Sequence, residues 1–185
     1  CALALPAVAQ DLVGKKAPEF SLVDQNGKTH KLSDYAGKNV VLEWTNPGCP
    51  FVVRHYEAGT MKNLANASAA DSVVWLAINS SHFTTSKESA EWAKKHGHTF
   101  PTLHDADGKV GKAYKAVTTP HMYVVDAKGM VAYEGAAAFK RIANIIDQTI
   151  NIKEDKNLPD LNLKDCNINF KNVDFSYQST NKEAV

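Results

Sequence analysis

The sequence predicts an α/β fold, in which a central mixed sheet is flanked by helices. Two nearly continuous apolar runs, at residues 39–44 and 73–78, are typical of strands that are buried on both faces of a sheet. Segments with apolar residues at helical spacing alternate with such strands along the chain. Turn-forming residues near each end of this pattern indicate antiparallel hairpins, so both strand directions should occur in one sheet.

The first predicted element is a β-hairpin that extends the sheet at its N-terminal side. Its strands lie at residues 20–23 and 29–32, and the Asn-Gly pair between them favours a tight reversal. The first buried strand then leads into a turn that carries Cys49. A helix is expected from Pro50, because proline suits the first helical position, where an N–H group would have no partner.

The later elements alternate between helix and strand. Residues 59–60 are expected to interrupt the first helix, and residues 85–88 form a capping box that opens an amphipathic helix, which Gly97 should end. The other predicted elements are the second buried strand, a short strand at 102–104, a brief helix at 110–114, strands at 122–126 and 130–133, and a closing helix at 139–150.

Composition divides the chain into three parts. Residues 1–10 resemble the end of a signal peptide, residues 11–152 form the folded domain, and residues 153–185 form an irregular C-terminal arm rich in Asn, Asp and Lys.

Basic and acidic residues are nearly balanced, 21 against 20, and are interspersed along the chain. Because a nucleic-acid-binding protein is expected to show a basic stripe, no nucleic-acid partner is expected.

The N-terminal segment predicts an exported, periplasmic or similar location. Ala7 and Ala9 match the small-x-small pattern that a signal peptidase recognises, so cleavage after Ala9 is expected. Lipid anchoring at Cys1 is the alternative, but a lipoprotein usually continues into a polar linker and this segment continues apolar. No later run reaches the roughly 18 apolar residues that a transmembrane segment needs.

Cys49 is the predicted reactive thiol, because it lies between a buried strand and the start of a helix. Unpaired N–H groups and the helix dipole stabilise a thiolate there. The pKa of such a cysteine can drop from about 8.5 to roughly 3.5–7.5. In an exported protein Cys49 and Cys166 can also pair, and the sequence leaves open whether the pair is structural or catalytic.

Four segments point to a known family: residues 17–22, residues 37–44, the motif Cys49-Pro50-Phe51-Val52 and residues 117–122. In these segments the chain resembles the alkyl hydroperoxide reductase/thiol-specific antioxidant (AhpC/TSA) and redoxin group. The resemblance covers about residues 12–150 and implies a thioredoxin-like fold. It also implies that Pro120 follows a cis bond and faces Cys49, with the backbone of Thr119 beside the sulfur.

The same resemblance suggests which residues shape the site and where the chain departs from the pattern. Val52 replaces the second cysteine of Cys-x-x-Cys, so no disulfide can close within the motif. Peroxiredoxins carry a threonine three residues before their reactive cysteine. Here that position is Asn46, and Thr45 precedes it. That family also uses an arginine to orient peroxide. Neither Arg54 nor Arg141 falls clearly at its position, although Arg54, one turn into the helix, could approach the sulfur.

Two further residues have candidate roles, each with an alternative. Cys166 could resolve a Cys49 sulfenate or mixed disulfide, or it could be an inert or permanently paired residue. His121 could lower the pKa of Cys49 as a neighbouring imidazolium, or it could be satisfied by a backbone carbonyl.

The remaining histidines and aromatics are assigned structural roles. His96, His98 and His104 lack the carboxylate or cysteine spacing of a metal site, so neither a metal nor another cofactor is expected. Trp44 and Phe51 are assigned to the core rather than to substrate contact.

Three functions of different classes remain open on these residues. The first is a thiol peroxidase in which Cys49 attacks peroxide and Cys166 resolves it. The second is a thiol-disulfide oxidoreductase that acts on protein partners. The third is a non-catalytic binding module or metallochaperone. The first two need a peroxide or a protein disulfide as substrate and a thiol reductant as partner.

Overall fold

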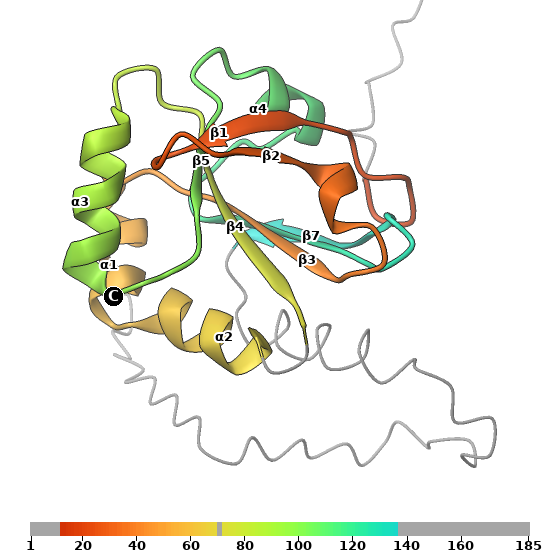
Figure 1. Cartoon of the computed structure of the whole chain (residues 1–185), viewed down its shortest axis with the longest axis horizontal. Coiled ribbons are helices and arrows are strands. Elements are labelled where there is room, and N and C mark those ends of the chain that lie inside the picture. The colour runs from red at the N-terminus through yellow and green to blue at the C-terminus, as the bar shows by residue number, and fades with distance from the viewer. Residues whose placement is uncertain (1–11, 70–71, 137–185) are drawn as a thin grey trace, which may run out of the picture. The chain divides into compact units, whose positions relative to one another are not determined.

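The computed structural model describes residues 12–69 and 72–136, which form one sheet with helices packed against it (Figure 1). The predicted closing helix at 139–150, Cys166 and the N-terminal segment lie outside the described residues. The domain boundaries near residues 10 and 152 therefore stay predictions. Among the described residues no helix combines the length and the apolar character that crossing a membrane requires.

The described residues contain a sheet of seven strands in the order β2-β1-β5-β4-β3-β6-β7. The strands are β1 (Ser21–Asp24), β2 (Thr29–Lys31), β3 (Val40–Trp44), β4 (Val74–Asn79), β5 (Thr102–His104), β6 (His121–Val125) and β7 (Val131–Ala136). β3, β4 and β5 are parallel neighbours, and the remaining pairs are antiparallel. The mixed sheet is thus confirmed, and the N-terminal hairpin forms one edge of it.

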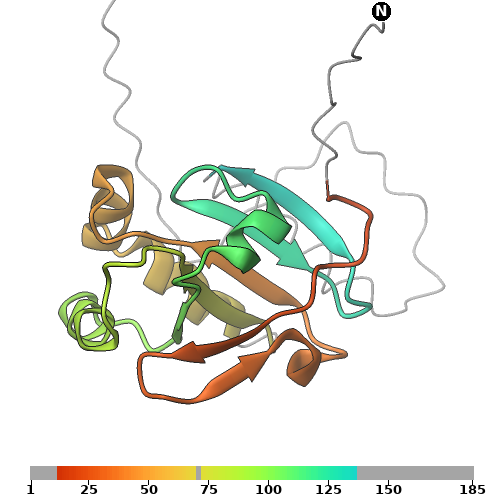
Figure 2. The same ribbon diagram turned by 90° about the horizontal axis from the view of Figure 1, so that it is seen from above.

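Helices pack on both faces of this sheet (Figure 2). They are the 3-10 helix η1 (Leu32–Tyr35) and the α-helices α1 (Pro50–Glu57), α2 (Thr60–Ala69), α3 (Ser86–His96) and α4 (Lys109–Tyr114). On one face the ring of Tyr114 in α4 lies 5.0 Å from that of Trp44 in β3. On the other face Tyr56 of α1 and Trp92 of α3 lie 5.2 Å apart, so α1 and α3 meet there.

The predicted limits of α3 are confirmed, and side-chain chemistry explains them. The Thr85 hydroxyl accepts a hydrogen bond from the Glu88 N–H at 3.2 Å, and the Glu88 carboxylate accepts one from the Thr85 N–H at 2.7 Å. These bonds satisfy N–H groups that the first helical turn leaves unpaired. Gly97 ends the helix with φ +63°, a conformation that residues with a Cβ rarely adopt.

Two details of the sequence prediction are wrong. Leu32 begins η1 rather than ending β2, because its buried side chain turns into the core just after the Lys31 N–H is capped by the Asp34 carboxylate at 2.9 Å. Phe51 is 67% exposed, while the adjacent Val52 is fully buried, since neighbouring positions of a helix cannot both face the sheet. The other aromatic assignment is confirmed, because Trp44 is buried.

Candidate active site at Cys49

The turn that carries Cys49 begins where β3 ends. Thr45 is buried, and its N–H donates to the Ile78 carbonyl of β4 at 2.9 Å. The Asn46 side chain then accepts a hydrogen bond from the Gly48 N–H at 2.8 Å, and the Asn46 backbone carbonyl accepts one from the Cys49 N–H at 2.9 Å. Asn46 therefore closes the turn through two hydrogen bonds, which is the usual use of asparagine at such a position.

Cys49 is the N-cap residue of α1 and has extended backbone angles, φ −86° and ψ 121°. Pro50 occupies the first helical position, and the Val53 N–H donates to the Cys49 carbonyl at 2.9 Å to form the first helical hydrogen bond. The thiol thus stands at the helix end where backbone N–H groups lack helical partners.

The loop before β6 brings a backbone carbonyl to the thiol. The Thr119-Pro120 peptide bond is cis, and the Cys49 thiol donates to the Thr119 carbonyl with an Sγ–O distance of 3.2 Å. The two segments meet because Trp44, at the end of β3, pairs with His121 at the start of β6. The cis bond and its position beside Cys49, which the family resemblance implied, are both present.

The surroundings of Cys49 favour the thiolate. Burial raises the pKa of the thiol, but hydrogen bonds from the Thr119 side chain and from the N–H groups of Val52 and Phe51 together outweigh burial and hold the pKa below its ordinary value. Those N–H groups belong to the first turn of α1, where the helix dipole also stabilises a negative charge. Arg54 is exposed on α1 and is not among the groups that shift this pKa, so its role stays a prediction.

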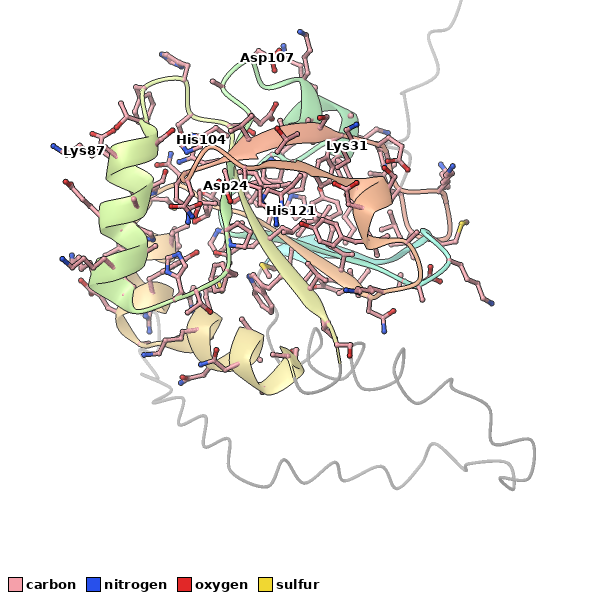
Figure 3. The ribbon with its side chains drawn as sticks, in the orientation of Figure 1. Asp24, Lys31, Lys87, His104, Asp107 and His121 are labelled. Atoms are coloured by element: carbon pink, nitrogen blue, oxygen red, sulfur yellow. The ribbon has the colours of Figure 1, made fainter. Side chains whose placement is uncertain are left out.

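His121 interacts with the core beneath the cis-proline loop. It is buried within the sheet (Figure 3), and its Nδ1 atom lies 3.3 Å from the Tyr123 hydroxyl. Burial lowers the pKa of His121 from its ordinary value, which favours the neutral ring. This direction disfavours the imidazolium, which is one of the two alternatives considered for His121, and its effect on Cys49 stays a prediction.

Glu43, in the middle of β3, was not predicted as a site residue, although a single acid within an apolar run is a recognisable signal. Its side chain is fully buried, and the Trp75 indole N–H donates to its carboxylate at 3.0 Å. Burial raises the pKa of Glu43 to about 7, although Trp75, Tyr56 and Thr45 act in the opposite direction. Glu43 can therefore gain or lose a proton near neutral pH while it is shielded from water.

Tyr56 connects this carboxyl to a layer of aromatic rings beneath α1. The ring of Tyr56 lies between 5.2 and 5.5 Å from the rings of Trp92, His96 and His98. Burial lowers the pKa of His98 to about 4, with a smaller contribution from His96. Both histidines thus serve as packing partners for the helix that begins next to Cys49.

Exposed apolar side chains surround the Cys49 turn. Phe51 follows the cysteine in α1, and Val117, in the loop before the cis-proline, is 87% exposed. Phe83 is 65% exposed and lines a pocket of about 580 Å³ together with Pro47. Such side chains are suited to contact with another molecule, because their burial in a complex is favourable.

Comparison with known proteins agrees with this geometry. A model of the AhpC/TSA family matches residues 13–134. The thiol-disulfide oxidoreductase ResA of Geobacillus kaustophilus is 34% identical over 119 residues, which cover 64% of this chain and 66% of that protein. A Mycobacterium tuberculosis protein provisionally named a peroxiredoxin is 28% identical over 123 residues, which cover 64% of this chain and 73% of that protein.

The fold has counterparts among solved structures. The solution structure of a Neisseria meningitidis protein, provisionally named a thioredoxin, superposes with a TM-score of 0.65 at 26% identity. The match covers 75% of this chain and 91% of the other. The thioredoxin-like α/β fold expected from the sequence is therefore confirmed.

We predict that alkylation of Cys49 by iodoacetamide shows an inflection below the pKa of about 8.5 that is ordinary for a cysteine. The thiolate is the nucleophile, and the α1 N–H groups stabilise it. The rate is measured as a function of pH by mass spectrometry of the peptide that contains Cys49. Cys49→Ser gives the background from Cys1 and Cys166. An inflection at or above 8.5 would contradict the prediction.

We also predict that Glu43 makes stability fall as the pH rises. The pKa of glutamate is 4.5 in the absence of burial and about 7 in the folded protein, so the folded state binds the proton more tightly. The stabilisation is complete below pH 4.5 and is lost as the pH rises through 7, a change of about 3 kcal/mol in the free energy of unfolding.

The measurement compares urea unfolding of the wild type and Glu43→Gln between pH 5 and 8. The relevant quantity is the difference in the free energy of unfolding between the two proteins at each pH. Neutral His98 makes stability rise over pH 4–6.5 in both proteins, so its effect cancels in that difference. A difference that does not change with pH would show that Glu43 is ionised throughout.

Proposed function

The chain belongs to the AhpC/TSA family, and we propose that it is an exported thiol-dependent oxidoreductase that exchanges disulfides through Cys49. The observation that carries the proposal is the position of the thiol, at the first turn of α1 and 3.2 Å from the Thr119 carbonyl. The first turn stabilises the attacking thiolate, and the Thr119 backbone offers an extended substrate a hydrogen-bonding edge beside the sulfur.

Disulfide exchange at this site proceeds in two steps. The Cys49 thiolate attacks one sulfur of a substrate disulfide, a bond forms between the two sulfurs, and the other substrate sulfur leaves as a thiolate. A second thiol then attacks the mixed disulfide and releases Cys49. Val52 occupies the place of a second cysteine in the motif and is fully buried, so this second thiol comes from elsewhere.

We propose Cys166 as one source of the second thiol and a separate thiol reductant as the other. Export rests on the N-terminal signal-like segment, and an oxidising compartment would supply disulfide substrates.

The exposed Phe51, Phe83 and Val117 support a protein substrate, since they offer apolar contact around the Cys49 turn. Relatives that are named for oxidoreductase activity favour an enzyme over a non-catalytic module or metallochaperone.

Peroxide reduction is the second candidate, and the similarity to a protein provisionally named a peroxiredoxin favours it. In that reaction the Cys49 thiolate attacks one peroxide oxygen, the O–O bond breaks, and water or an alcohol leaves as Cys49 becomes a sulfenic acid. Asn46 stands where peroxiredoxins carry a threonine, and we propose Arg54, one turn into α1, as the residue that could approach the sulfur.

Rapid mixing of the reduced protein with a disulfide-bonded peptide, and separately with hydrogen peroxide, tests the two candidates. Cys49 should exchange with the disulfide about tenfold faster than free cysteine at pH 7, because more of it is thiolate. Cys49→Ser should show no exchange at this position. Reaction with peroxide faster than that of a free thiolate would favour the second candidate, and no acceleration with either reagent would refute both.

Mild oxidation followed by mass spectrometry tests the resolving thiol. We expect a disulfide-linked peptide pair that contains Cys49 and Cys166, and its loss in Cys166→Ser. Cys1→Ser is the matched control, because it removes a thiol without removing the proposed resolver. If Cys49 sulfenic acid or a mixed disulfide persisted in the wild type, Cys166 would not be the resolving thiol. An external reductant would then be the only source of the second thiol.

A further inference from the structure

A second pocket, of about 460 Å³, lies beside the Cys49 turn at the carboxyl ends of the parallel strands β3 and β4. It is lined by residues 44–46 at the end of β3, by residues 80–81 after β4, by part of α4 and by residues 115–119. Asn46 and Thr119 belong both to this lining and to the hydrogen bonds that hold Cys49. In open α/β sheets, ligands commonly bind outside the carboxyl ends of parallel strands.

The floor of the pocket is built by close contacts. The Trp44 indole N–H donates to the Ser80 hydroxyl at 3.2 Å, and that hydroxyl donates to the Asp105 carboxylate at 2.7 Å. A Cβ atom on Gly111 would lie 3.0 Å from the Ser80 oxygen and 3.4 Å from the Trp44 nitrogen. Glycine at this position therefore lets α4 pack against the ends of β3 and β4, so the pocket has a defined shape.

The side chains that line the pocket carry positive charge. Lys112 and Lys115 of the α4 region line it, and none of its lining residues is acidic. Lys112 is exposed and has no ionic partner in the part of the chain that the structure describes. The other pocket beside the turn differs, because Glu88 and Glu91 contribute to its lining.

The nearby Asp105 does not place its carboxylate on the surface of the pocket. It is buried and does not line the pocket. Its two carboxylate oxygens accept hydrogen bonds from Val110 N–H at 3.1 Å, Gly111 N–H at 2.8 Å and the Ser80 hydroxyl. Its acceptor capacity is thus directed at the start of α4, and exposed Lys112 can contact an anion in the pocket.

We propose that this pocket binds a low-molecular-weight thiol that carries a carboxylate and presents its sulfur to Cys49. The inference rests on the disulfide-exchange function proposed above and identifies the class of reductant. The pocket volume is in the range that suits small ligands. A carboxylate held by Lys112 and Lys115 would orient the ligand, and its thiol would reach the sulfur past Thr119.

The bound thiolate attacks the Cys49 sulfur of a mixed disulfide, a new S–S bond forms to the small thiol, and the substrate sulfur leaves as a thiolate. A second small thiol then displaces Cys49 and forms the small-molecule disulfide, so two thiols are oxidised for each substrate disulfide reduced. The reverse of this second step, attack of reduced Cys49 on a small disulfide, passes through the same transition state and is measured directly.

The test follows the reaction of reduced, full-length Cys166→Ser protein with three small disulfides that differ mainly in charge. Dithiodiglycolate is anionic, hydroxyethyl disulfide is neutral and cystamine is cationic. The background substitution lets the mixed disulfide on Cys49 accumulate, and mass spectrometry gives its rate of formation. Lys112→Gln, Lys115→Gln and their combination remove the proposed carboxylate contacts.

Each single substitution should slow the reaction with dithiodiglycolate about threefold, and the combination about tenfold. The rate with cystamine should rise, and the rate with hydroxyethyl disulfide should stay within about twofold. Lys109→Gln is the matched control, because Lys109 is in the same helix, does not line the pocket and pairs with Asp107. It should leave all three rates within about twofold.

The possible outcomes are distinct. The proposed pocket would be overturned if the wild type and the combined variant showed the same ratio of rates with the anionic and the cationic disulfide. It would also be overturned if Lys109→Gln had the same effect as Lys112→Gln, because that result would indicate diffuse surface charge. Both of these results leave disulfide exchange at Cys49 intact, because the neutral disulfide still reacts. Failure of Cys49 to react with any of the three would refute the proposed function and this inference together.

Discussion

The central position of β3 is the constraint on which the rest of this structure depends. Its five residues pair with β4 on one side and with β6 on the other, so both of its edges and both of its faces are covered. The parallel partner lets the chain cross over through helices, and the antiparallel partner brings the start of β6 to the end of β3. Cys49 and Thr119 therefore meet although 70 residues separate them.

The same strand separates two kinds of chemistry. Trp44 faces a core with Tyr114 and Tyr123, whereas Glu43 faces Trp75 and Tyr56 on the opposite side. Beyond the end of the strand, the Thr119 side chain and the N–H groups of α1 lower the pKa of the Cys49 thiol. In the middle of the strand burial raises the pKa of a carboxyl. The pKa values of Cys49 and Glu43, six positions apart, are thus shifted in opposite directions. Hydrogen bonds lower the first, and desolvation raises the second.

Much of the fold was predictable because local patterns and tertiary packing agree. The apolar run of β3, the capping box of α3 and Gly97 each point to the element that forms there. Phe51 was not predictable in the same way, since an aromatic residue beside a buried one can face either side of a short helix. Glu43 was overlooked because an apolar run predicts burial without indicating what a polar member of that run contacts.

The sequence by itself determined the α/β class, the strand-to-helix turn that activates Cys49 and the absence of a second cysteine from its motif. These features depend on neighbouring residues, whose hydrogen bonds and periodicity are local. The family resemblance already implied that the Thr119 backbone lies beside the thiol, but only the tertiary structure decided that Glu43 is desolvated. Only the tertiary structure placed Lys112 and Lys115 around a pocket that shares Asn46 with the active-site turn. These relations join segments that are distant along the chain, and sheet order and packing bring them together.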